Sequence, residues 1–219
     1  MDLVTILGIA YGVRLVNYLL NKLPNSTPYM QFFLNPNQHP DHMHFPRLLY
    51  DDNNNIPDKP GIYGWYFSYL FDKLFDDASK ADFAQNALKI ETPQEPHKEY
   101  YLMYIGITEK SLRNRIYDKH LYGNSEDSTL RQSLAALFYD DIRLDPRKQL
   151  TGEEERTRLN SWIFEYARVA WITIDAPKPV EREFIKRYGK VLPLNLENND
   201  YNPWGDNLRA LRKKWRAFG

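Results

Sequence analysis

The sequence predicts an α+β fold in which a small central mixed sheet of three strands is flanked by helices. Three segments are rich in β-branched and aromatic residues, the composition of buried strands: 62–67, 100–107 and 167–175. Between them, apolar residues recur at spacings of three and four, which favours amphipathic helices. The chain has 219 residues, enough for one domain with additions.

The chain is predicted to divide into three parts. The run DDNNN at 51–55 is typical of a loop, so residues 1–55 are interpreted as an N-terminal helical extension. Residues 56–200 form the main domain, and residues 201–219 form a basic C-terminal tail. The extension begins with an apolar stretch that Arg14 and Asn17 interrupt, which favours a packed soluble helix and leaves membrane association as the minor alternative.

An insertion is predicted between the first two strands. Residues 68–90 have the spacing of one or two amphipathic helices, and a polar linker follows at 91–99. After the second strand, Ser111 can cap a helix. That helix carries on one side the residues Leu112, Ile116 and His120.

Three further helices are predicted from the second half of the chain. Residues 128–141 and 152–167 have helical patterns, and the third strand follows the second of them. A last helix is expected to start near Glu181 and to end at Gly189.

Composition excludes several classes of site. The chain has no cysteine, which removes disulfides, thiolate zinc sites and a cysteine nucleophile, and which suits the cytoplasm. Lys and Arg together number 29, as do Asp and Glu, so the formal net charge is zero. Bulk electrostatics therefore do not attract the chain to nucleic acid, and any polyanion site must be a local patch.

Two polar segments remain ambiguous. Three histidines, His39, His42 and His44, lie in a Pro-bounded loop, but their spacing matches no common metal site. The C-terminal run 207–219 is basic, with a helical pattern. It is interpreted either as a solvated tail or as a segment that contacts a phosphate backbone.

Two short motifs lie in the first two predicted strands: Gly61-Ile62-Tyr63 and Tyr104-Ile105-Gly106. The residues that follow in matching order are Thr108, Leu112, Arg115, Glu181 and Asn195. A triplet of common residues is easily found by chance. The whole ordered set, in strands and helices of the matching type, is specific. Over residues 56–199 the chain therefore resembles the GIY-YIG endonuclease family, and residues 130–208 resemble a bacterial subgroup of it.

The resemblance implies a nuclease that cuts DNA phosphodiester bonds with one divalent ion, Mg²⁺ or Mn²⁺, per active site. Glu181 matches the family's metal ligand, and Mg²⁺ suits one carboxylate with water and phosphate in the other positions. Arg115 flanks the apolar side of its helix and can reach the scissile phosphate. Tyr63 or Tyr104 would take or relay the proton of water, and Asn195 matches the asparagine that closes the family's core.

The residue that assists the tyrosine is open between two neighbours. Many relatives have His or Tyr four residues after the arginine, whereas here that position is Lys119 and His120 comes fifth. At ~100° per residue of α-helix, the fourth position is about 40° round from Arg115 and the fifth about 140°. Lys119 is therefore a candidate to face the phosphate. The cations expected to contact nucleic acid are Lys110, Arg113, Lys186 and Arg187.

A self-contained chain of this size favours a restriction or defence nuclease. The competing enzymes are a repair or structure-specific nuclease and a mobile-element enzyme, and a different class is a catalytically idle module that binds nucleic acid or protein on the same fold. One active site cuts one strand, so double-strand cleavage would need a homodimer or successive nicking. Single-stranded DNA and RNA stay open as substrates.

Overall fold

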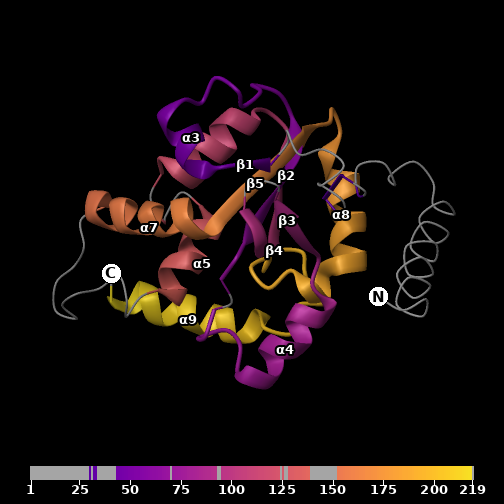
Figure 1. Ribbon diagram of the computed structural model, residues 1–219, viewed down its shortest axis with the longest axis vertical. Coiled ribbons are helices and arrows are strands. Elements are labelled where there is room, and N and C mark those ends of the chain that lie inside the picture. The colour runs from indigo at the N-terminus through magenta and orange to yellow at the C-terminus, as the bar shows by residue number, and fades with distance from the viewer. Residues whose placement is uncertain are drawn as a thin grey trace, which may run out of the picture.

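Figure 1 shows the chain as a computed structural model, with a central sheet that helices cover on both faces. The structure describes residues 30, 32–33, 43–69, 71–92, 95–123, 125, 128–138 and 152–218. Within this part of the chain, no helix is long and apolar enough to cross a membrane. The apolar N-terminal stretch, and with it the predicted helical extension up to residue 29, lies outside the described residues.

In the described part of the chain, five strands form one sheet in the order β1-β5-β2-β4-β3, and every neighbouring pair is antiparallel. The strands are β1 (Met43–His44), β2 (Gly61–Phe67), β3 (Lys89–Thr92), β4 (Glu95–Thr108) and β5 (Ala167–Thr173). All seven residues of β2 are buried. This is expected of a central strand that has a neighbour on each edge and helices on each face.

The prediction of a three-stranded mixed sheet was wrong in two respects. Strands β1 and β3 have two and four residues, which is too short for a periodicity to stand out. Of the segment 91–99, predicted as a polar linker, residues 91–92 end β3 and residues 95–99 begin β4, and this position at the edge of the sheet tolerates polar side chains. The order of helices and strands along a chain also does not fix strand direction, because a long connection can return to either end of a sheet.

The two faces of the sheet have different covers. Alternating residues of β2 point to opposite sides, so Ile62 and Tyr66 pack with helix α8, while Tyr63, Trp65 and Phe67 face the remaining helices. The helices are α3 (Pro46–Asp51), α4 (Asp77–Asn86), the π-helix η3 (Asn114–Leu121), α5 (Thr129–Leu137), α7 (Gly152–Tyr166), α8 (Pro177–Tyr188), the 3₁₀ turn η4 (Gly189–Val191) and α9 (Gly205–Phe218).

The helices predicted between residues 68 and 189 are confirmed, with shifted ends. The N-cap predicted at Ser111 accepts a hydrogen bond from the backbone N–H of Asn114 at 3.0 Å. Helix α8 begins at Pro177, four residues before the expected start, because proline is favoured at the first helical position. Glu181 therefore lies beyond the first turn of α8, and the helix dipole is not what makes this position favourable for a carboxylate.

Asn195 holds the segment after η4 against the edge of β4 that no described strand pairs with. Its Oδ1 accepts from the backbone N–H of Ile105 at 2.8 Å, and its Nδ2 donates to the carbonyl of Ile105 at 2.7 Å. The N–H of Leu194 donates to the carbonyl of Met103 at 3.1 Å. This segment thus satisfies backbone groups that no strand pairs here, since β3 pairs only with the earlier part of β4.

Replacing Asn195 with alanine should destabilise the domain. The substitution leaves the buried N–H and C=O of Ile105 without partners, and each such group costs ~1–3 kcal/mol. We expect the free energy of unfolding, measured by urea denaturation, to fall by about 3 kcal/mol. The control is Asn207→Ala, which removes an exposed amide that donates to the Lys73 carbonyl and should change stability by less than ~0.5 kcal/mol. Equal losses would contradict this role for Asn195.

Candidate active site

A cleft of about 290 Å³ opens between β4, α8, the loop after η4, and α9. Among the residues lining this central cleft are Tyr63, Tyr104, Arg115, Glu181 and Asn195. They come from separate parts of the chain: β2, β4, η3, α8 and the loop that Asn195 holds against β4. The fold therefore brings together the residues that the two motifs and their followers predicted as a site.

Tyr63 is at the centre of a buried chain of hydrogen bonds. Its hydroxyl lies 2.7 Å from Nε2 of His120, whose Nδ1 lies 2.7 Å from Oγ of Ser128. Nε of Arg115 donates to the same Tyr63 hydroxyl at 3.2 Å. Because Tyr63 already accepts from Arg115, we assign its own proton to the bond with His120, which places the imidazole proton on Nδ1, facing Ser128.

Burial sets the charge states in this chain. The pKa of His120 is lowered well below its usual value, first by burial and then by the charges of Arg115 and Arg131. His120 is therefore neutral near pH 7 and has the capacity to accept a proton. Burial also raises the pKa of Tyr63 well above its ordinary range, with the neighbouring Tyr104 as the next cause. A free Tyr63 phenolate is consequently not populated near neutral pH.

The π-helical winding of η3 explains how His120, rather than Lys119, reaches Tyr63. In η3, the N–H of Tyr122 donates to the carbonyl of Tyr117 at 2.7 Å, a bond that spans five residues where an α-helix spans four. This wider winding returns the fifth residue after Arg115 to the side of the helix that faces β2. The expectation from α-helical angles therefore does not apply here, and Lys119 is not among the residues lining the central cleft.

Gly106 makes room for the Tyr63 ring. The two residues are paired across β2 and β4. A Cβ on Gly106 would lie 2.5 Å from Cζ of Tyr63 and 3.0 Å from Cε1 of Tyr104, closer than such atoms approach. The glycine of the second motif is thus required by the tyrosine of the first, and the two tyrosine rings lie side by side with centroids 6.3 Å apart.

Tyr104 is the more open of the two tyrosines. It is 7% exposed, whereas Tyr63 is 0% exposed. Its hydroxyl lies 3.3 Å from Oγ1 of Thr129, the first residue of α5. Tyr104 and Thr129 both line the cleft, so the Tyr104 hydroxyl lies where the cleft meets the start of α5.

Glu181 presents a half-buried carboxylate to the cleft. Its pKa is raised by burial and then by the charge of Glu197, against the opposing effects of Arg182 and Lys178. Within the described residues, no hydrogen bond or ion pair holds this carboxylate. A carboxylate whose charge is incompletely compensated favours a bound cation, so Glu181 fits a divalent ion held by one protein ligand with water and phosphate in the other positions.

The other predicted site residues lie elsewhere. Arg113 donates from Nε to the carbonyl of Ile56 at 3.1 Å, a bond that holds the loop before β2. Arg187 forms an ion pair with Glu183 and lines a separate pocket beside α4. Lys110 and Lys186 are exposed on the surface outside the cleft. Their contacts with nucleic acid stay predictions.

Sequence reasoning missed the residues that hold His120 in place through buried hydrogen bonds. Arg131 is 0% exposed. It donates from its backbone N–H to Ser128 Oγ, from NH1 to the carbonyl of His120 and from NH1 to Oδ1 of Asn160. Asn160 in turn donates to the carbonyl of Leu121 at 2.7 Å. A polar residue in a helical pattern gives no signal of this kind, because the partners are remote in sequence.

The cleft also contains cations that were not predicted as site residues: Lys178 and Arg182 on α8, and Arg212 on α9. Lys178 forms an ion pair with Glu109 at 2.7 Å. The spacing of Lys178 and Arg182 around Glu181, three residues before it and one after, could have indicated Lys178 as a neighbour on the same face.

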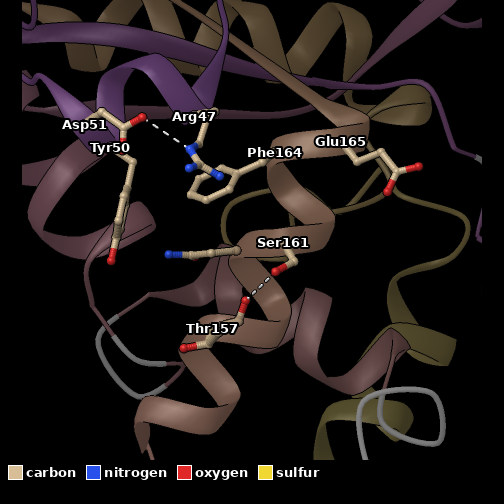
Figure 2. Close-up of a pocket in the computed structure, with 8 residues that line it drawn as sticks. Arg47, Tyr50, Asp51, Thr157, Ser161, Phe164 and Glu165 are labelled. Atoms are coloured by element: carbon tan, nitrogen blue, oxygen red, sulfur yellow. Dashed lines mark hydrogen bonds and ion pairs between the residues drawn. The ribbon is translucent and has the colours of Figure 1, made fainter.

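A second pocket lies between α3 and α7, and Asn160 is one of the residues that line it (Figure 2). Its charged residues Arg47 and Asp51 pair with each other at 3.2 Å, and Ser161 donates to the carbonyl of Thr157. These groups already satisfy one another, so this pocket offers weaker chemistry than the central cleft.

No group of three or more His, Cys, Asp or Glu side chains suited to a metal ion occurs among the described residues. His44 stacks on Trp171 with ring centroids 3.9 Å apart, while His39 and His42 lie outside the described part of the chain. The histidine run is therefore not tested by the described part of the chain.

A family model described as the GIY-YIG catalytic domain matches residues 61–214, from the first residue of β2 into α9. The match includes both tyrosine motifs, Arg115, Glu181 and Asn195. Comparison with curated proteins and with solved structures gave no match.

The neutral state of His120 predicts a pH-dependent stability. Unfolded histidine binds a proton near pH ~6.5, whereas the folded pKa of His120 is lower, so stability is lost as pH falls below ~6.5. This group contributes a limiting slope of about 1.4 kcal/mol per pH unit. Urea denaturation between pH 7.5 and 5 should give a shallower decline for His120→Gln than for the wild type. Parallel declines would contradict a buried neutral His120.

Proposed function

The chain belongs to the GIY-YIG family, whose domains are typically nucleases that use divalent metal ions, and we propose that it is an endonuclease that hydrolyses DNA phosphodiester bonds with Mg²⁺ bound at Glu181. The observation that carries the proposal is the convergence of Tyr63, Arg115 and Glu181 on one cleft, with a neutral His120 bonded to the Tyr63 hydroxyl. A catalytically idle relative would have no need to keep this set together.

Tyr63 and His120 act as a proton relay in this proposal. The raised pKa of Tyr63 argues against a stored phenolate, so Tyr63 passes its proton to Nε2 of His120 as it takes one from the attacking water. The resulting hydroxide forms the new P–O bond while the bond to the leaving oxygen breaks, and the leaving oxygen then takes a proton from solvent water. Nε2 of His120 carries no proton in the neutral ring and has room for one, and Ser128 fixes the ring through Nδ1.

Arg115 stabilises the phosphate in this scheme. A guanidinium has five N–H donors, and Nε of Arg115 donates to Tyr63. Charge-assisted bonds from the other donors to the phosphate would strengthen as negative charge accumulates in the transition state. The same residue therefore couples the position of the phosphate to the position of the base.

Glu181 would hold the divalent ion, with water and phosphate oxygens completing its shell. When bound, the ion supplies positive charge that polarises the phosphate and steadies the leaving oxygen. Glu197 lines the same cleft and raises the pKa of Glu181, which makes the pair of carboxylates more favourable for a cation.

We propose a restriction or defence role for this activity, and the preferred substrate tests it. The remaining candidates are distinguished by their substrates: double-stranded DNA for a restriction enzyme, branched DNA for a repair enzyme, and binding without cleavage for an idle module. Cutting both strands of a duplex would require two active sites or successive nicks.

Cleavage of supercoiled plasmid in Mg²⁺ tests the assignment of Glu181 and Arg115. Glu181→Gln and Arg115→Lys should each lower the cleavage rate by ~10²–10³-fold, because each removes charge or geometry needed in the transition state. The matched controls are Glu183→Gln, on the same helix outside the cleft, and Arg47→Lys, in the second pocket.

Both controls should cut at the wild-type rate. Cleavage at the wild-type rate by Glu181→Gln and Arg115→Lys would contradict the assignment of these residues to the active site. A wild-type protein that cuts neither plasmid, single-stranded DNA nor RNA would support the idle module instead.

The relay makes different predictions for the three buried tyrosines. Tyr63→Phe should lower the cleavage rate by ~10²–10⁴-fold, the range expected for loss of a general base. Tyr66→Phe is the matched control, because Tyr66 is equally buried on the same strand but bonds the carbonyl of Phe33 on the opposite face. Tyr104→Phe should have a smaller effect than Tyr63→Phe. The reverse order would transfer the role of base to Tyr104.

A further inference from the structure

One side of α9 gathers the basic residues of the C-terminal segment. Its cations stand at helical spacings of three and four, so they share a face: Arg209, Arg212, Lys213 and Arg216. Helix α9 packs against α5, the helix whose first residue bonds Tyr104. The segment predicted as a basic tail is therefore a helix beside the central cleft.

This face borders a groove that continues the central cleft. A pocket of about 280 Å³ lies beside the cleft and is lined by all four cations. Leu196, Glu197 and Arg212 line both spaces, so the two are contiguous. A strand that enters the central cleft would therefore leave it along α9.

Arg212 stands at the junction with unused hydrogen-bonding capacity. It is 9% exposed, and within the described residues its Nε has no hydrogen-bond partner. NH2 of Arg212 and NH2 of Arg216 both donate to Oε1 of Gln132. Two guanidinium groups thus share one neutral oxygen, which does not compensate their charges.

Carboxylates compensate the charge of this face only in part, since burial lowers the pKa of Arg212 and the charge of Glu197 raises it by less. In the described part of the chain, Arg209 forms an ion pair with Asp206, but Arg212, Lys213 and Arg216 have no such pair. Glu197 also lines the groove, on the side where Glu181 would hold a cation. The uncompensated positive charge lies along α9, where it suits an extended anion.

We propose that this face of α9 binds the sugar-phosphate backbone of the substrate strand next to the scissile phosphate, with Arg212 nearest the active site. The proposal rests on the nuclease function proposed above and adds where the strand runs. Arg216 comes seven positions after Arg209, which corresponds to a rise of ~10 Å along the helix at 1.5 Å per residue. Phosphates of one strand follow one another every ~3.4 Å along the axis of B-DNA, so a face lying parallel to that axis spans about three of them.

The test compares two adjacent exposed lysines of α9. Lys213 lines the groove and Lys214 does not. Lys213→Gln and Lys214→Gln remove the same charge from the same helix, so they share any effect on net charge or helix stability. Both are made in the Glu181→Gln background, and binding to a duplex is measured in EDTA at several salt concentrations, so that the duplex is not cut.

For Lys213→Gln, the slope of log K against log salt should become shallower by ~0.9, the change expected for one lost phosphate contact on B-DNA. The double variant Lys213→Gln/Arg216→Gln should lose about twice as much, and Lys214→Gln should keep the slope of its parent. Both exposed positions avoid the packing loss that replacing the buried Arg212 would cause. Equal slopes for the Lys213 and Lys214 variants would overturn the proposal.

Cleavage by the protein with native Glu181 separates this inference from the proposed function. If that protein cuts DNA while the Lys213 and Lys214 variants bind alike, the function stands and the path along α9 is wrong. If it cuts no nucleic acid, the proposed function fails, and the salt slopes alone then decide whether α9 binds the backbone.

Discussion

The hydrogen bond between the Tyr63 hydroxyl and Nε2 of His120 joins residues 57 positions apart in the chain, and much of the architecture serves to make it. β2 must be buried at the centre of the sheet so that Tyr63 points into the helical layer. Gly106 must lack a side chain so that the Tyr63 ring fits against β4. The winding of η3 must then bring the fifth residue after Arg115 to the same place.

The central strands could be predicted because their composition is decisive: β2, the second half of β4 and β5 are almost wholly apolar and buried on both faces. The edges could not, because β1 and β3 are short and partly polar, and such strands are defined by the neighbour they pair with. The direction of the strands could not be predicted from local composition either. It depends on the end of the sheet to which each long connection returns.

Much of the site could be predicted where a motif fixes both residue type and element. The ordered set of Tyr63, Tyr104, Arg115, Glu181 and Asn195 lines one cleft. The choice between Lys119 and His120 could not be made, because angles calculated for an α-helix do not hold for a π-helix. Ser128 and Arg131, which orient His120, have no local pattern at all, since they act through tertiary hydrogen bonds.

A chain with no net charge can still hold a polyanion if it separates its charges in space. The carboxylates Glu181 and Glu197 line the cleft, where a divalent ion would reverse the local sign. The same cleft is lined by the cations Lys178 and Arg182 on α8 and Arg212 on α9. In the proposed function, the phosphate backbone would bind these cations and the divalent ion would bind the carboxylates. A chain with zero formal net charge can therefore still contain a strongly charged site. An ion bound at the carboxylates would screen their repulsion of the phosphate backbone.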